Sequence, residues 1–279
     1  MLPNLTLYFV GCTIAFLVMF KVTEVVVPNL MAVVDPKFDM LKEKSKKEYY
    51  SRVISNVHAT IAVAMSVYGV WFVCEDGQSI FSSDECLVTP QKVNVYLTVL
   101  SSAYCFYDMY VVLYEINYSK KEQAEFIYHH VVGIAGALFS VALGRQNPPL
   151  SAAVLVSEIS NFAMNCRWFM LKHDLADHAL FMPVNFVFML TFFLTRVVFM
   201  LLILIRNAHA HTLFGLTDQG PVFMFMQAAT DTLLFALYLL QLWWFWGIAK
   251  VVYKTVIGQG DAARQETTVE TAPDSQKKN

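Results

Sequence analysis

Seven apolar segments, each close to the length needed to cross a bilayer, constrain this chain more than any other feature. A transmembrane helix needs about 20 predominantly apolar residues. Such segments occupy residues 5–27, 53–74, 93–115, 126–143, 150–171, 182–205 and 222–246, and the fourth is the shortest. The pattern predicts an all-α, polytopic membrane protein with about seven transmembrane helices, and Pro28 is expected to end the first.

The amino-acid composition supports this prediction. Hydrophobic residues make up 57% of the 279 residues and charged residues only 15%, whereas soluble domains carry about 25% charged residues. So little polar surface excludes a water-soluble globular enzyme. The 20 basic and 22 acidic side chains give a net charge of −2, which excludes the basic surface that nucleic-acid binding requires.

Basic residues predict the orientation of the chain, because they concentrate in cytosolic connections. Connections that follow the first, third, fifth and seventh segments hold most of them: Lys37, Lys42, Lys44, Lys46, Lys47, Arg52, Lys120, Lys121, Lys172, Lys250 and Lys254. The N-terminus is therefore expected in the lumen and the C-terminus in the cytosol. Cys74 and Cys86 then flank a lumenal loop, where they form either a disulfide or two free thiols.

The last residues of the chain differ sharply from the rest. Residues 258–279 contain one Val and no Leu, Ile or aromatic residue, so a disordered cytosolic tail is expected. Lys277 and Lys278 lie near the terminus. They resemble an imperfect dilysine retrieval signal, although a solvated basic tail is the simpler interpretation.

Ionisable side chains inside the apolar segments are the most informative feature for function. A charged group at the centre of a bilayer costs about 2.5 kcal/mol or more, and such groups normally face a bundle interior or a wet cavity. This chain carries several of them: His58, Asp108, His129, His130, Glu158, Arg196 and Asp231. Because lipid offers them no partner, we expect them to face one another around a common interior.

Helical spacing supports that interior. Glu158, Asn161 and Asn165 are three and four residues apart and share one helix face, as do Asp231 and Tyr238 with their neighbouring glutamines. The polar groups are expected toward the cytosolic end, with apolar lining beyond. Such a cavity suits a lipid acyl chain whose head group lies at the cytosolic mouth. The residues predicted to bind lipid or to pair helices are His58, Asn161, Asn165, Arg196, Asp231 and Tyr238.

His129 and His130 are the strongest candidates for catalysis. An inward-facing neutral imidazole could act as a base or nucleophile toward an acyl group. Adjacent side chains on a helix point about 100° apart, so at most one is expected to be the inward-facing reactive group. Glu158 could orient that imidazole, and Asp108 completes the candidate catalytic set. Alternatively, Arg196 simply pairs with Asp231 or Glu158 to hold helices together.

These residues lie in segments that resemble the TLC-domain family, which includes ceramide synthases and translocating-chain-associated proteins. The resemblance covers about residues 45–252 and rests on five segments: 52–58, 104–108, 129–133, 157–168 and 193–196. It implies a protein of the endoplasmic reticulum with a role in lipid metabolism or homeostasis. It also implies three parts: a first helix and basic loop (1–44), a TLC domain (45–255) whose six helices form a barrel around a lipid cavity, and a tail (256–279).

Within that family the chain departs from the ceramide synthases. Their expected motif is a histidine pair, followed in the fifth span by His-Asp-x-x-Asp. The histidine pair is present, but the later segment reads Ser157-Glu158-Ile159-Ser160-Asn161. One acid is kept as Glu158, whereas the histidine and the second acid are absent. The pattern is therefore nearer to the TLC domain-containing protein 4 branch, and ceramide synthesis itself is disfavoured.

Two functions remain open from the sequence. The chain is an acyltransferase that uses acyl-CoA as co-substrate, without a metal or another cofactor, or it is a non-catalytic lipid-binding regulator of membrane composition or a cargo adaptor. Either function implies a membrane lipid or fatty-acyl partner. A seven-helix receptor is less favoured, because Asp108-Met109-Tyr110 lacks the arginine of the receptor signature. A di-iron enzyme is less favoured because only seven histidines are present.

Overall fold

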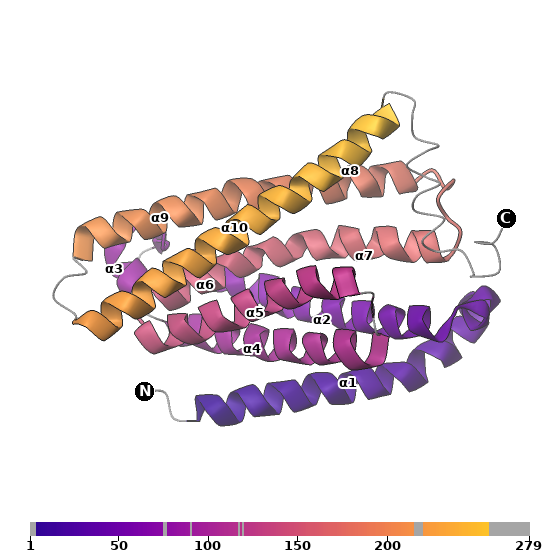
Figure 1. Ribbon diagram of the computed structural model, residues 1–279, viewed down its shortest axis with the longest axis horizontal. Helices are drawn as coiled ribbons and strands as arrows, with labels where there is room; N and C mark the ends of the chain where they lie inside the picture. Colours follow the sequence, from indigo (N-terminus) through magenta and orange to yellow (C-terminus); the bar gives the residue numbers. More distant parts are fainter. Residues whose placement is uncertain are drawn as a thin grey trace.

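The computed structural model describes residues 4–74, 77–89, 91–116, 118, 120–214 and 220–256 (Figure 1). Within these ranges all regular secondary structure is helical. Six helices are long and apolar enough to cross a membrane. The predicted all-α, polytopic membrane fold is therefore confirmed. The predicted tail, from residue 257 onward, lies outside the described residues.

The helical elements follow one another along the whole described chain. The α-helices are α1 Leu5–Val34, α2 Glu43–Trp71, α3 Asp84–Val88, α4 Lys92–Tyr110, α5 Lys120–Leu143, α6 Asn147–Val154, α7 Ile159–Lys172, α8 Phe181–Phe192, α9 Phe199–Phe214 and α10 Pro221–Val256. Two 3-10 segments, η1 Pro36–Met40 and η4 Leu155–Glu158, and two π-helical segments, η3 Val111–Ile116 and η5 Phe193–Val198, join or extend them.

Two details of the sequence prediction are wrong. Pro28 does not end the first helix, because α1 continues through it to Val34. Transmembrane helices tolerate proline where neighbouring groups satisfy the freed backbone. The predicted fifth span is not one α-helix either, since η4 separates α6 from α7. Pro148 and Pro149 lie in the first turn of α6, where the missing N–H donors cost nothing.

The long helices form a closed ring. Going around it, α2 contacts α4, α4 contacts α5, α5 contacts α10, α10 contacts α8, α8 contacts α7, and α7 contacts α2. We call this assembly the ring; η5 and α9 continue α8, and η4 and α6 precede α7. Helix α1 packs on α4 and α2 from outside. The arrangement agrees with the expected barrel of six spans with the first helix outside it.

One end of the ring is closed by protein. Helix α6 contacts α2, α4, α5 and α9 at once, and α3 packs against it. Leu150 and Ala153 of α6 are buried together with Val70 of α2, Ile80 of the loop before α3, and Ile203 of α9. The end where α3 and α6 lie in Figure 1 is therefore filled with apolar side chains.

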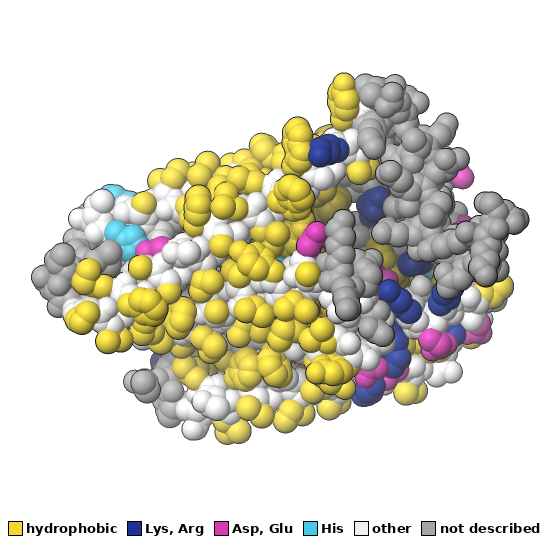
Figure 2. All heavy atoms as spheres, in the orientation of Figure 1, with side chains coloured by type: hydrophobic (Ala, Val, Ile, Leu, Met, Phe, Trp, Pro, Cys, Tyr) yellow, Lys and Arg dark blue, Asp and Glu magenta, His cyan; other side chains and the backbone are white. Residues whose placement is uncertain are grey.

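The two ends of the molecule differ in charge. Hydrophobic side chains cover the middle of the face shown in Figure 2, whereas most Lys, Arg, Asp and Glu side chains gather at the end opposite α3. We call it the basic end. There the outer helix α1 is tied to the ring by ion pairs: Lys47 contacts Glu24 and Glu115, and Lys21 lies 3.2 Å from Glu115. His173 also bonds to Asp35, and this hydrogen bond lowers the pKa of Asp35.

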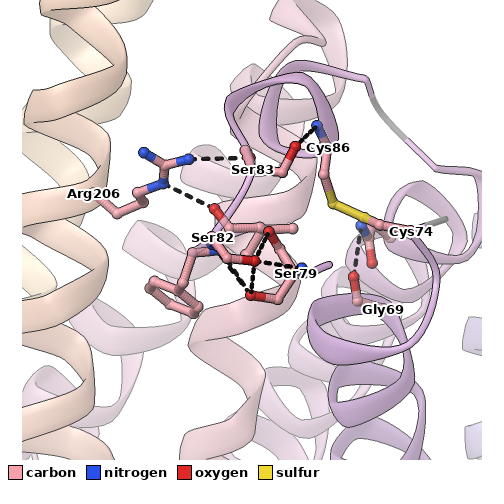
Figure 3. The surroundings of a disulfide bond; sticks show 10 residues. Gly69, Cys74, Ser79, Ser82, Ser83, Cys86 and Arg206 are labelled. Carbon is pink, nitrogen blue, oxygen red and sulfur yellow. Dashed lines mark hydrogen bonds between the residues drawn. A yellow bond between two sulfur atoms is a disulfide. The ribbon is translucent and has the colours of Figure 1, made fainter. Parts of the chain in front are cut away.

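A disulfide joins Cys74 to Cys86 at the closed end (Figure 3). Arg206 of α9 fixes the same loop, because its Nε donates to the carbonyl of Ile80 at 2.8 Å and its Nη2 to that of Ser83 at 3.1 Å. Arg206 also lies 2.7 Å from a carboxylate oxygen of Asp84. Of the two states left open by the sequence, the structure has the disulfide.

We expect the substitution Cys74→Ser to lower the thermal stability of the purified protein. The bridged cysteines are 12 residues apart, and closing a loop of this size restricts the unfolded chain by about 3 kcal/mol. Thermal unfolding in detergent measures the change. Cys166→Ser is the control, since Cys166 is a free, exposed cysteine. Equal midpoints for both variants would show that the disulfide does not stabilise the closed end.

Candidate functional site

The ring encloses a cavity of about 1000 Å³. Side chains from all six helices of the ring line it, and apolar residues such as Leu150, Phe192 and Leu237 form part of the wall. The lining includes all but one of the residues predicted from the sequence: His58, Asp108, His129, His130, Glu158, Asn161, Asn165, Arg196 and Asp231. Tyr238 does not line the cavity. The predicted common interior therefore exists.

His130 is held by an acid and a backbone carbonyl. Its Nδ1 donates to the carbonyl oxygen of Phe126 at 2.8 Å, and its Nε2 lies 3.2 Å from Oδ2 of Asp108. Ser51 donates to the other oxygen of Asp108 at 3.0 Å. Because Nδ1 carries a proton, Nε2 and Oδ2 attract one another only with a second proton between them. The pair is therefore an imidazolium with a carboxylate or an imidazole with a carboxylic acid.

His129 has no such partner. Its Nδ1 is buried without a hydrogen bond, and Nε2 bonds to no described residue. The ring centre lies 5.3 Å from that of Trp244 and 5.3 Å from that of His130, in edge-to-face geometry. Both histidines line the cavity, and they differ in the contacts that their ring nitrogens make. A buried polar group without a partner is rare in folded proteins and marks a candidate site of function.

Glu158 and Arg196 form the centre of a second polar group. Oε1 of Glu158 lies 3.7 Å from Nη2 of Arg196, and Nδ2 of Asn161 donates to Oε2 of Glu158 at 2.6 Å. Every nitrogen of the Arg196 guanidinium is used: Nε donates to Ser160, Nη1 to Gln241, and Nη2 to Asn161. Arg196 therefore pairs with Glu158 rather than with Asp231.

His58 borders this group from α2. Its ring stacks on Tyr104 with centres 3.8 Å apart and planes 4° from parallel, and its Nε2 lies 3.2 Å from the Ser101 hydroxyl. Its Nδ1 is 3.7 Å from Oε2 of Glu158. The carboxylate predicted to orient the histidine pair thus contacts His58, whereas Asp108 contacts His130.

The remaining predicted residues lie toward the two ends. Near the basic end, the amide of Asn165 accepts from Arg52 at 2.9 Å and donates to Asn56 at 2.8 Å. Toward the closed end, Asp231 accepts from Asn207 and Gln227. These contacts join α2 to α7 and α9 to α10.

Several cavity residues that make these contacts were not predicted. Ser51 and Ser101 position Asp108 and His58, Asn207 holds Asp231, and Trp244 packs on His129. Serine and asparagine carry no charge, so nothing marks them as costly within an apolar segment. Trp244 belongs to an aromatic cluster near a helix end, a pattern that equally describes a membrane interface. Among the described residues, no three His, Cys, Asp or Glu side chains form a metal-binding group.

Comparison with known proteins agrees with this architecture. A family model described as the TLC domain matches residues 49–250. This chain belongs to the TLC-domain family. The match begins within α2 and ends within α10, so it covers the ring and leaves α1 outside. TLC domain-containing protein 4-B of Danio rerio is 27% identical over 230 residues, which cover 80% of each chain. Membership of the TLC-domain family indicates a membrane protein related to lipids.

We expect Arg196→Leu to destabilise this TLC-domain protein strongly. Removing one partner of a buried ion pair costs about 3–5 kcal/mol, because the other charge stays buried and unpaired. The double variant Arg196→Leu/Glu158→Leu should recover part of the loss, since it removes both charges. The stabilities are compared by heating each protein in detergent and measuring the fraction that stays monodisperse. A double variant no more stable than the single one would argue against coupling between these residues.

Proposed function

We propose that the chain binds the acyl chain of a membrane lipid in its cavity and transfers an acyl group with His129 as base. The observation that carries this proposal is the imidazole of His129, whose buried Nδ1 has no hydrogen-bond partner, on the wall of a cavity of about 1000 Å³. A volume of this size lies at the upper end of the range for small-molecule sites. The apolar part of the wall suits hydrocarbon.

The proposed chemistry needs an acyl thioester, such as acyl-CoA, and an acceptor with an O–H or N–H group. His129 takes the proton of the acceptor while the acceptor oxygen or nitrogen attacks the acyl carbonyl. The tetrahedral intermediate then collapses, the carbon–sulfur bond breaks, and His129 returns the proton to the leaving thiolate. No further reactant is required.

His130 and Asp108 have a supporting role in this proposal. Their contact joins α5 to α4 and holds one proton beside the reacting group. Because the two imidazole rings lie edge to face at 5.3 Å, the environment of His129 depends on the position of His130. Asp108 is thus a positioning residue that acts through the histidine next to it.

A second candidate is a non-catalytic lipid-binding protein that regulates membrane composition or adapts cargo. The contacts of Glu158 favour it: the carboxylate is engaged with Arg196, Asn161 and His58. No acid within the described part of the chain forms an ion pair or hydrogen bond with His129, so the base lacks the orienting carboxylate common in acyl-transfer sites.

His129→Ala separates the two candidates. Purified protein is incubated with acyl-CoA and a mixture of lipid alcohols and amines, and the products are analysed by mass spectrometry. Loss of a general base lowers the rate by about 10²–10⁴-fold. His209→Ala is the control, because His209 is half exposed and does not line the cavity. Copurified lipid without turnover in any variant would support the binding protein instead.

We also propose that the protein resides in the endoplasmic-reticulum membrane, with its basic end in the cytosol and its disulfide in the oxidising lumen. Basic residues favour the cytosolic side, and disulfides persist in oxidising compartments. The two features lie at opposite ends of the ring, so both support the same orientation.

Gly77→Asn tests this orientation. Together with Gln78 and Ser79 it completes an N-glycosylation acceptor sequence in the loop that the disulfide closes. Asparagine tolerates the left-handed backbone at this position, where φ is 68°. We expect a glycosidase-sensitive mass increase on expression in eukaryotic cells. A second variant carries an acceptor sequence inserted at the basic end. If this second variant is glycosylated and Gly77→Asn is not, the assigned orientation is reversed.

A further inference from the structure

Three arginines line the cavity, and they differ in how their guanidinium groups are used. Arg196 donates from all three nitrogens. Arg52 donates from Nη1 to Asn165 and from Nη2 to Glu48. Arg167 donates only from Nε, to Oδ1 of Asn185 at 2.7 Å. Its two terminal amines make no hydrogen bond to any described residue.

The contact with Asn185 orients Arg167 rather than neutralising it. The guanidinium also lies 6.0 Å from the ring centre of Phe181, so two residues of α8 hold its Nε side. No carboxylate of a described residue forms an ion pair with Arg167. A half-buried arginine without a counter-ion is costly in a membrane protein, and such charges normally mark a substrate path or a ligand site.

The two terminal amines of Arg167 lie at the basic end of the cavity. Arg167 lies in the second half of α7, the half that leads to Lys172 at the basic end. From α10, Lys250 and Trp246 line the same cavity, with the ammonium 5.1 Å from the ring centre of Trp246. Glu125 also lines it, but forms no ion pair with Arg167 or Lys250. Among the described residues, no acid therefore forms an ion pair with Arg167 or Lys250.

We infer that Arg167 binds a phosphate group carried by the lipid whose acyl chain occupies the cavity. The two free amines of a guanidinium fork match two phosphate oxygens, a geometry that a lysine cannot reproduce. Lys250 supplies further positive charge from the facing helix. The inference rests on the proposed lipid-binding function, because the phosphate is anchored by an acyl chain in the cavity. A glycerophospholipid and a coenzyme A thioester both present this chemistry.

Binding of matched lipid pairs tests the inference. The affinity of each lipid for the full chain in neutral detergent is measured by displacement of a fluorescent fatty acid. The first pair compares dioleoyl phosphatidic acid with dioleoylglycerol. The second pair compares oleoyl-CoA with S-oleoyl-pantetheine. We expect the phosphate-bearing member of at least one pair to bind about tenfold more tightly or better, the size expected for charged hydrogen bonds. The pair that shows the preference identifies the source of the phosphate.

In Arg167→Gln this preference should disappear while the affinity for the neutral lipids stays unchanged. Arg167→Lys should retain part of it, since the charge remains but the fork is lost, and it also controls for folding. Arg145→Gln is the matched arginine control, because Arg145 does not line the cavity and its guanidinium lies 5.8 Å from the ring centre of Phe223. Suppose that neutral lipids bind to both proteins. The inference is then overturned if wild-type and Arg167→Gln proteins prefer the phosphate-bearing lipid equally, or if neither protein prefers it. Binding of no lipid at all would instead refute the proposed function.

Discussion

The structure depends on neutralising charge inside a bundle whose outside faces hydrocarbon. Arg196 is buried, and the groups around it come from two neighbouring parts of the ring: Glu158, Ser160 and Asn161 around the start of α7, and Gln241 from α10. An unpaired guanidinium there would cost several kcal/mol, so these helices cannot separate or rotate independently. These polar contacts hold three successive parts of the ring together along one wall of the cavity.

Irregular turns set the positions of both partners in this ion pair. Arg196 lies in the π-helical segment η5, and Glu158 is the last residue of the 3-10 segment η4. Such interruptions within long helices frequently occur at functional sites. Here they allow two helices of the ring to turn a charged side chain inward while their flanking turns keep apolar side chains toward lipid.

The fold and the residues that line the site could be predicted from the sequence. Which of these residues contact one another could not. Segment lengths and hydropathy determine how many helices cross the membrane. The cost of buried charge determines that His58, Asp108 and Glu158 face inward. Which acid meets which histidine depends on helix rotation, and η4 changes that rotation. A 3-10 turn advances each residue by about 120° instead of 100°, so four residues shift the helical wheel by about 80°.

The environment of the adjacent histidines was equally inaccessible from sequence. His129 and His130 are identical in type and neighbours on one helix, yet His130 contacts Asp108 and a carbonyl oxygen, whereas His129 packs against the ring of Trp244. The difference arises from α4 and α10, which lie on either side of α5. Local sequence therefore identifies the pair, and only tertiary contacts distinguish its members.

The closed end has a consequence for the supply of lipid. Helix α6 and the disulfide-bonded loop fill that end of the ring with protein. Under the proposed lipid-binding function, a lipid that enters the cavity from the basic end leaves by the same end. We therefore expect the protein to exchange molecules with a single leaflet, and to preserve any asymmetry between the two leaflets rather than dissipate it.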